Sequence, residues 1–311
     1  MRTTFFLTVE KYYKKDKNVF VLTADLGFKL FDSIKNISPN RFYNMGIAEA
    51  NMIGTSAGIA LTGGKVYCYS IIPFLVMRAY EQIRVDIDYH DLDVKMVGMG
   101  SGFSYGLEGI THFGLEDIAL MRSLQNVAVV VPADMREAAC FADISYNHKG
   151  PMFIRMGSTN APFVYTKKPA IKMGKAVFLK EGKHAVIFAV GDMVHNSLRA
   201  ADILAGKGIK TTVVNMHTIK PLDAEAVKSM AQKHDFIFTV EEHNISGGLG
   251  SAVAEVISEA GICRVFKRIG IPSKLKNVIG RADHLRKFYG LYPEGIAGAI
   301  LKEMKQKNKE A

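Results

Sequence analysis

The segment AEANMIGTSAGIALTGGKVYCYS, residues 48–70, joins a stretch with helical spacing to a short β-branched and aromatic run through two glycines. The same alternation recurs on both sides of this segment. Other strand-like runs lie at 18–25, 94–100, 127–134 and 152–157, and helical spacing returns at 76–89 and 116–124. Strands that alternate with helices along a chain predict a parallel α/β sheet.

A second alternating set follows a break in this pattern. From 157 to 169 the sequence GSTNAPFVYTKKP consists largely of turn-forming residues, which is typical of a linker. Beyond it, nearly all-apolar strands at 184–191, 210–219 and 235–242 alternate with helices, as in a sheet that is covered on both faces. We therefore expect two α/β domains, each a mostly parallel sheet with helices on both faces: 1–157 and 173–303, with a linker at 158–172 and a lysine-rich tail at 304–311.

The composition narrows the class of protein. The chain has 311 residues, 48% of them apolar, which is enough for two globular domains. It contains no apolar run near the roughly 20 residues of a membrane span, and its N-terminal sequence becomes charged too early for a secretory signal, so we expect a cytoplasmic protein.

The three cysteines lie far apart without a CxxC pair, so neither a disulfide framework nor a zinc site is indicated. The formal charge of +10 comes from scattered lysines rather than a basic stripe, which favours phosphorylated or nucleotide-bearing substrates over a nucleic acid as partner. No membrane partner is expected either.

One carboxylate stands out in the segment 43–60. Glu49 falls in the first turn of the expected helix, where the helix dipole alone favours an acid. The residues around it are small enough to let another backbone approach and bury the helix: Gly46, Ala48, Gly54, Ala57 and Gly58. A buried carboxyl is suited to sharing a proton with a ring nitrogen, so Glu49 is a candidate functional residue as well as an ordinary first-turn acid.

Several separated motifs resemble one enzyme family. RFYNMGIAEANMIGTSAGIAL, RAYEQIRVDI, GLEGITHFGLEDIALMRSLQNVAVVVPAD, GPMFIRMG, HTIKPLD and VEEHNISGGLGSAVAEV occur in the order found in transketolases, over about residues 7–301. The resemblance is to the C-terminal half of a thiamine-diphosphate-dependent transketolase encoded as two chains. It implies a pyrimidine-binding domain at 1–157 and a transketolase C-terminal domain at 173–303.

The resemblance also implies a partner chain. The N-terminal transketolase subunit carries the diphosphate-binding domain, whose Gly-Asp-Gly and downstream Asn hold Mg²⁺ or Ca²⁺ on thiamine diphosphate. The nearest match here, Gly191-Asp192-Met193, lacks the last glycine and the paired Asn, so no metal ligands are expected in this chain. We therefore expect an enzyme that is active only with its partner, with two chains of each kind around sites formed between subunits.

The family's cofactor residues map onto four positions. Glu49 matches the catalytic glutamate, which hydrogen-bonds N1′ of the aminopyrimidine and so promotes deprotonation of the thiazolium. Phe74 falls where an aromatic ring stacks on the pyrimidine, although it could equally be a core residue. Leu26 matches the bulky residue that supports the bent cofactor, and the adjacent Asp25 could be a cofactor contact or a turn residue.

The substrate residues match the family only in part. His112, on a glycine-rich loop, matches the histidine that hydrogen-bonds oxygens of the donor sugar. Three positions depart: Gly100 replaces a histidine, Glu108 replaces an aspartate that reads hydroxyl stereochemistry, and Ser158 replaces an arginine that grips the sugar phosphate, which leaves Arg155 nearby. A serine cannot supply the bidentate contact of a guanidinium. We therefore expect a non-standard sugar, which could be non-phosphorylated, nucleotide-linked or modified.

Our interpretation is a split transketolase subunit that transfers a two-carbon ketol unit from a ketose to an aldose. Three alternatives stay open: the beta subunit of a 2-oxo acid dehydrogenase, a deoxyxylulose-phosphate-synthase-like enzyme, and a non-catalytic subunit that kept the fold. The glycines of EEHNISGGLG also suggest an anion site at a helix start, although the segment matches a structural part of the family's C-terminal domain.

Overall fold

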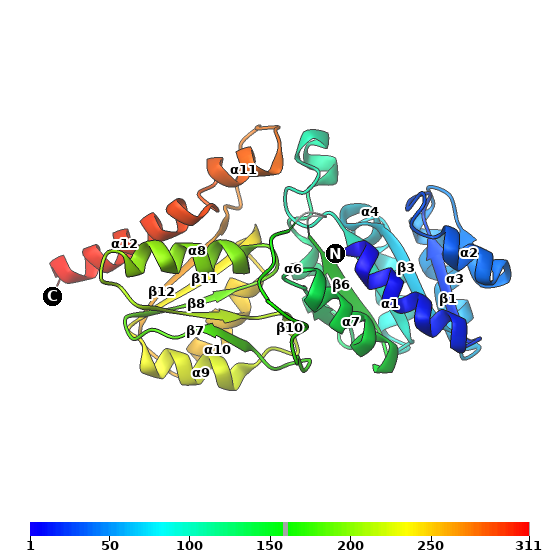
Figure 1. The fold of residues 1–311 in the computed structure, drawn as a ribbon, viewed down its shortest axis with the longest axis horizontal. Coiled ribbons are helices and arrows are strands. Elements are labelled where there is room, and N and C mark those ends of the chain that lie inside the picture. Colours follow the sequence, from blue (N-terminus) through cyan, green and yellow to red (C-terminus); the bar gives the residue numbers. More distant parts are fainter. Residues whose placement is uncertain (158–160, 311) are drawn as a thin grey trace.

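The computed structural model of the chain describes residues 1–157 and 161–310. They form two mostly parallel sheets, each with helices on both faces, as the sequence predicted (Figure 1). The first sheet has seven strands in the order β10-β5-β6-β4-β3-β1-β2, and the second has five in the order β12-β11-β8-β9-β7.

The first sheet is parallel except at one edge. Its six parallel strands come from the N-terminal half: β1 (Val19–Thr23), β2 (Phe42–Asn44), β3 (Lys65–Ile71), β4 (Val94–Met99), β5 (Ala128–Val130) and β6 (Met152–Met156). The seventh, β10 (Thr218–Lys220), comes from the C-terminal half and pairs antiparallel with β5.

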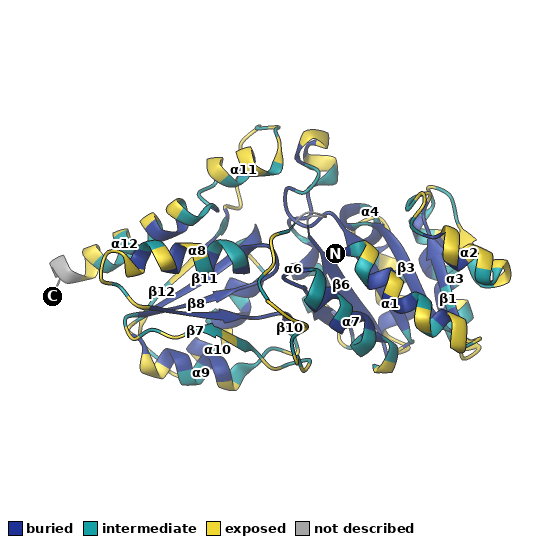
Figure 2. Cartoon of the chain, viewed as in Figure 1, coloured by how far each residue is buried: buried dark blue, intermediate teal, exposed yellow. Residues whose placement is uncertain are grey.

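Side chains on alternate positions of the strands enter two different hydrophobic clusters. In β3, Tyr67 and Tyr69 make edge-to-face contacts with Phe5 and Phe6 of α1, whereas Cys68 faces the opposite cluster. Helices α1 (Arg2–Lys15), α2 (Asp32–Ile37) and α7 (Met135–Asn147) cover the first face, and α3 (Glu49–Leu61), α4 (Ile72–Val76) and α6 (Asp117–Ser123) cover the second. Except in the edge strand β2, both faces of the strands are therefore largely buried, which explains their nearly continuous apolar sequences (Figure 2).

The expected helix at 76–89 is broken. The chain forms α4, then α5 (Tyr80–Gln82) and a π-helical turn η2 (Ile83–Asp88). The carboxylate of Asp88 at the end of this turn accepts hydrogen bonds from three successive backbone N–H groups, Gln125 to Val127, at 2.7–2.9 Å. Such tertiary contacts are invisible to helical spacing, which is a purely local signal.

The second sheet follows the same plan. Its strands are β7 (Val177–Lys180), β8 (Ala185–Ala189), β9 (Thr211–Asn215), β11 (Phe236–Asn244) and β12 (Val265–Ile271), parallel except for β7 at the edge. Helices α8 (Met193–Ala205) and α12 (Pro293–Glu310) pack together on one face, and α9 (Ala224–Lys233) and α10 (Leu249–Glu259) on the other.

The two halves share more than a linker. The stretch 210–219, expected as one strand, divides at Met216 into β9 and β10, and the backbone carbonyl of His217 accepts from the Val131 N–H at 2.8 Å. One hydrophobic cluster accordingly contains residues of both sheets, such as Val129 and Phe188. The halves are therefore packed into a joint core at this edge.

The C-terminal end of the chain also differs from what the sequence predicted. The lysine-rich segment 304–311, expected as a tail, continues α12 as far as Glu310. Short helices complete the structure: η1 (Pro39–Arg41), η3 (Gly106–Glu108), η4 (Ile110–His112) and α11 (Ala282–Phe288). Within the described ranges, the helices are all too short or too polar to cross a membrane.

Candidate active site

Three of the expected site residues lie where parallel strands of the first sheet reach their carboxyl-terminal ends. Glu49 begins the helix after β2, Phe74 lies in the helix directly after β3, and Gly100 follows the last residue of β4. Ligands of parallel α/β sheets bind at this edge, because loops from several strands converge there. Segments far apart in the sequence are thus brought to one place.

Glu49 is a buried carboxylate with two partners. It is the first residue of α3 and is 1% exposed. Its Oε1 accepts a hydrogen bond from the Ser70 hydroxyl at 3.1 Å, and its Oε2 accepts one from Nη1 of Arg78 at 2.5 Å. The N-terminal end of the helix dipole adds a favourable field for the negative charge.

Arg78 is a site residue that sequence reasoning missed. Its guanidinium carbon lies 4.6 Å from the centre of the Phe74 ring, and 45% of its side chain is exposed. Arg78 lies in the turn that follows α4, and its spacing of four residues from Phe74 was the signal that could have placed the two side chains together. A planar group with N–H donors therefore stacks on Phe74 and bonds to Glu49 at the same time.

His112 also contacts the Phe74 ring. The two rings are 5.0 Å apart between centroids and meet edge to face. His112 is half-buried at the end of η4, and its Nδ1 is 2.9 Å from the Thr111 hydroxyl. Glu108, on the preceding η3, is exposed, and its carbonyl accepts from the Thr111 hydroxyl. The loop thus holds His112 beside Phe74 and leaves Glu108 at the surface of the chain.

Asp25 and Leu26 form the turn after β1. Asp25 has a left-handed backbone (φ 52°), and it exchanges two hydrogen bonds with the Asn44 side chain, at 2.9 and 3.1 Å. Asn44 also accepts from the Gly46 N–H, which lies just before the helix of Glu49. Leu26 is half-buried against the cluster under α1. Asp25 therefore acts here as a turn residue that links β1 to the segment leading to Glu49.

Gly100 has the conformation and surroundings that glycine requires. Its φ is +93°, and a Cβ at this position would lie 2.4 Å from two carbons of the Tyr105 ring. The Tyr105 ring thus occupies the space that a side chain at position 100 would need. The sequence did not single out Tyr105.

Arg155 does not have the free guanidinium that a substrate contact needs. It is 2% exposed and pairs with Asp117 at 2.7 Å, and it also donates to the carbonyls of Gly114 and Glu242. Arg155 thus joins Gly114 and Asp117 to Glu242 of β11 in the second domain, and the contact with a substrate that was expected of it stays a prediction. Ser158 lies outside the described residues.

Glu242 and Arg286 add further contacts between the loop that carries His112 and the C-terminal half. The Glu242 carboxylate accepts from the Phe103 N–H at 3.2 Å and from Arg286 at 2.7 and 2.9 Å. Arg286 also pairs with Asp192 at 2.8 Å. The loop that carries His112 is therefore fixed by charged side chains of the C-terminal half.

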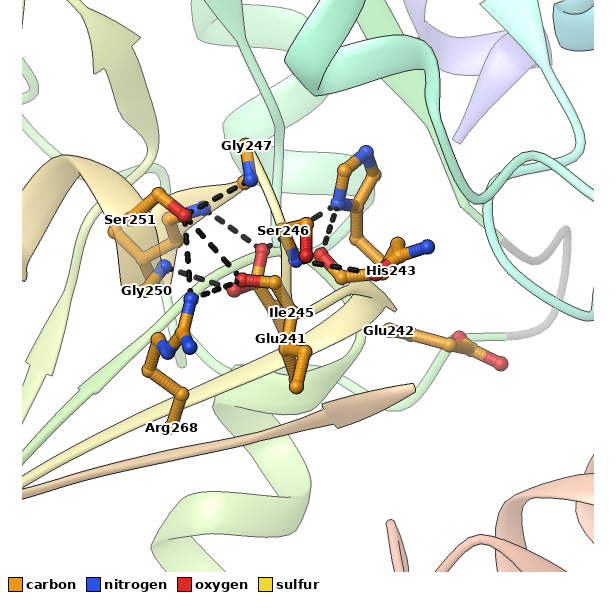
Figure 3. Close-up of polar contacts among 12 residues, drawn as sticks. Glu241, Glu242, His243, Ile245, Ser246, Gly247, Gly250, Ser251 and Arg268 are labelled. Carbon is orange, nitrogen blue, oxygen red and sulfur yellow. Dashed lines mark hydrogen bonds and ion pairs between the residues drawn. The ribbon is translucent and has the colours of Figure 1, made fainter. Parts of the chain in front are cut away.

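The glycine-rich start of α10 already holds an anion of its own. The Glu241 carboxylate accepts from the N–H groups of Leu249 and Gly250 at 2.7 and 2.8 Å (Figure 3). Burial raises the pKa of Glu241 to about 7, and burial lowers the pKa of the neighbouring His243 to about 4. The expected alternative of an external anion site is thus not supported, because a side chain of the protein occupies it.

Comparison with known proteins identifies the family. The family model of the transketolase pyrimidine-binding domain matches residues 1–163, and that of the transketolase C-terminal domain matches residues 174–296. A putative transketolase C-terminal section of Methanocaldococcus jannaschii is 40% identical, over 98% of this chain and 96% of its own length.

Two further relatives are named for particular sugars. An apulose-4-phosphate transketolase subunit of Actinobacillus succinogenes is 36% identical over 85% of both chains. A 6-deoxy-6-sulfo-D-fructose transketolase subunit of Clostridium sp. (strain MSTE9) is also 36% identical, over 99% of this chain and 95% of its own.

A solved structure shows the same architecture. It is described as a split gene transketolase, inactive beta4 tetramer, and it is 33% identical, with a TM-score of 0.87 over 98% of this chain and 97% of that one. The chain therefore belongs to the transketolase family and consists of its pyrimidine-binding and C-terminal domains.

Proposed function

We propose that this chain is the pyrimidine-binding and C-terminal subunit of a split transketolase, which transfers a two-carbon ketol unit from a ketose donor to an aldose acceptor. The observation that carries this proposal is the geometry at Glu49. A buried carboxylate at the edge of the sheet binds a planar donor group that is stacked on Phe74. Because that guanidinium is 45% exposed, a ligand from solvent can reach the position that it occupies.

The described residues fit the aminopyrimidine ring of thiamine diphosphate. That ring is planar and carries a nitrogen that can bond to a carboxyl group, so it could replace the Arg78 guanidinium in both of its contacts. Thiamine diphosphate supplies the nucleophilic carbon and the electron sink for cleaving the ketose. Glu49 would hold the proton shared with the ring nitrogen, Phe74 would support the ring face, and Leu26 would support the cofactor from the end of β1.

His112 is the residue that we assign to the donor sugar. Its Nδ1 is engaged by the Thr111 hydroxyl, so Nε2 is the nitrogen that exchanges hydrogen bonds with donor oxygens. The edge-to-face contact with Phe74 fixes the imidazole beside the ring that supports the cofactor. A histidine in this position could both bind the donor sugar and transfer a proton to or from it.

A partner subunit completes the site in this proposal. The N-terminal transketolase subunit would contribute the diphosphate-binding domain and the Mg²⁺ or Ca²⁺, in an assembly with two chains of each kind in the cytoplasm. The neighbour that is described as an inactive beta4 tetramer supports the need for a partner. Light scattering of the co-expressed chains tests the assembly, and two chains that run separately would contradict it.

The donor in this proposal is a modified sugar. The relatives named for apulose-4-phosphate and 6-deoxy-6-sulfo-D-fructose support it, as do the departures at Gly100 and Ser158. The test is turnover of a panel of ordinary and modified ketoses by the co-purified pair with thiamine diphosphate and Mg²⁺, with Glu49→Gln as the inactive control. Ordinary rates on xylulose 5-phosphate with ribose 5-phosphate would contradict the modified sugar, and no turnover of any donor would contradict the enzyme.

A further inference from the structure

The Tyr105 ring occupies the place where a side chain of residue 100 would begin. Its Cδ2 and Cε2 both lie 2.4 Å from the ideal Cβ position of Gly100, which is shorter than any ordinary contact of a Cβ atom. Any larger residue at position 100 would therefore have to displace the ring, and its backbone would be strained at φ +93°. The two positions form one unit in which an aromatic ring covers a glycine.

The loop holds this ring between two anchors. On one side, Gly102 and Gly114 exchange backbone hydrogen bonds at 2.9 and 3.1 Å. On the other, the Gly280 N–H of the C-terminal half donates to the Gly106 carbonyl at 3.3 Å, and a Cβ on Gly106 would lie 2.2 Å from the Gly280 oxygen. Because the backbone is fixed before and after Tyr105, the ring has little freedom to move away from Gly100.

The ring also forms part of the row of side chains at the candidate active site. Its centroid is 6.1 Å from that of His112, which in turn meets Phe74 at 5.0 Å. Tyr105 is half-buried, so part of it remains accessible. It also lines a hollow of about 260 Å³ with Ser104, Glu108 and Arg281. The same ring thus lies near His112 and lines a hollow that could accept additional atoms of a substrate.

We propose that Tyr105 is a specificity-determining residue that limits the size of the donor sugar beside His112. This inference rests on the function proposed above. The ring fills the space next to Gly100, presents an aromatic surface near His112 and forms part of the wall of the hollow. Donors that fit against this wall are accepted, and donors that extend into the space of the ring are excluded by contact.

The test uses the complex co-purified with its N-terminal partner. For Tyr105→Ala, Tyr105→Leu and Tyr105→Phe, kcat and KM are measured with the donor that the wild-type complex turns over best and with its homologue one carbon longer. Tyr105→Ala should raise the ratio of kcat/KM for the longer donor to that for the shorter one about tenfold, mainly through KM. Tyr105→Leu keeps apolar packing for the fold and should shift the ratio in the same direction, whereas Tyr105→Phe should leave it within about threefold.

A double-mutant cycle of thermal stability tests the contact between Gly100 and Tyr105 without an activity assay. Gly100→Ala should lower the thermal midpoint, and Gly100→Ala with Tyr105→Ala should lower it by less than the sum of the single changes. The control Phe178→Ala, an exposed aromatic on β7, should leave the donor ratio unchanged. If the wild-type complex is active and neither Tyr105→Ala nor Tyr105→Leu changes its donor ratio, the inference alone is overturned. A wild-type complex that is inactive on every donor would overturn the proposed function and this inference together.

Discussion

Replacing Arg78 with methionine should destabilise the free chain and tighten its binding of thiamine diphosphate. In the structure the guanidinium makes the two contacts that the aminopyrimidine ring is proposed to make, one to the Glu49 carboxylate at 2.5 Å and one to the face of Phe74. The cofactor must displace it from both. Methionine keeps most of the length of the side chain and removes the charge and the donors.

The size of the effect follows from the burial of the two partners. Removing one member of a fully buried ion pair costs about 3–5 kcal/mol. Here the carboxylate is 2% exposed but the guanidinium is 45% exposed, so water screens the pair, and we expect a loss of about 1–2 kcal/mol in the free energy of unfolding. The same free energy no longer opposes the cofactor, which corresponds to a dissociation constant about 5- to 30-fold lower.

Two assays separate these effects. Urea unfolding of the purified chain measures stability without cofactor, and calorimetric titration of thiamine diphosphate into the complex with its partner, in Mg²⁺, measures affinity. Arg84→Met is the matched control, because Arg84 is an exposed arginine of the neighbouring η2 and should change neither quantity. Weaker or unchanged affinity in Arg78→Met would refute the displacement argument, and unchanged stability would refute the strength assigned to the ion pair.

Three further predictions concern two contacts between the halves and the carboxyl group at the start of α10. Glu242→Ala leaves the Phe103 N–H and Arg286 without their shared acceptor, so kcat of the complex should fall about tenfold or more and stability by about 2 kcal/mol, measured by donor turnover and urea unfolding. Gly106→Ala places a methyl group against the Gly280 carbonyl, so its thermal midpoint should fall by several degrees, as measured by calorimetry. Glu241→Gln removes the titration of this carboxyl group. Since the folded pKa is raised to about 7, wild-type stability from this group is present below pH 4.5 and is lost as the pH rises through 7. Urea unfolding should therefore show the variant gaining on wild type between pH 4.5 and pH 8, by up to about 3 kcal/mol.

Each of these has a contrary outcome. Full activity of Glu242→Ala would show that the second domain does not position the loop. An unchanged midpoint for Gly106→Ala would show that the two backbones can separate without cost. A constant difference between Glu241→Gln and wild type from pH 5 to pH 8 would show that the carboxylate stays ionised at the start of α10, as its two N–H donors alone would favour.

The sequence was informative wherever the signal is local. The spacing of apolar residues predicted α3, and the strand-like runs at 65–70 and 94–100 correspond closely to β3 and β4. The same residues predicted Glu49 at the first turn of its helix, which is where the structure has it. Periodicity and helix-start chemistry depend on neighbouring residues, so they can be read without the fold.

Other features depended on contacts between distant segments. Arg78 pairs with a carboxylate 29 positions away, and Phe103 and Glu242 are 139 positions apart. Strand β10, from the C-terminal half, joins the sheet of the N-terminal half by pairing with β5. Arg155 looked available for a substrate because its partner Asp117 could not be inferred from its neighbours in the chain.

By itself, then, the sequence determined the two α/β domains, their order, and the carboxylate at the end of the first sheet, since these follow from local pattern and from which residue types occur. Only the tertiary structure decided which side chains meet there. It placed Arg78 on Glu49, set Tyr105 over Gly100, and buried Arg155 in an ion pair. The physical reason is that burial, ion pairing and exclusion of volume are properties of atoms brought together in space, and the chain order alone does not specify those distances.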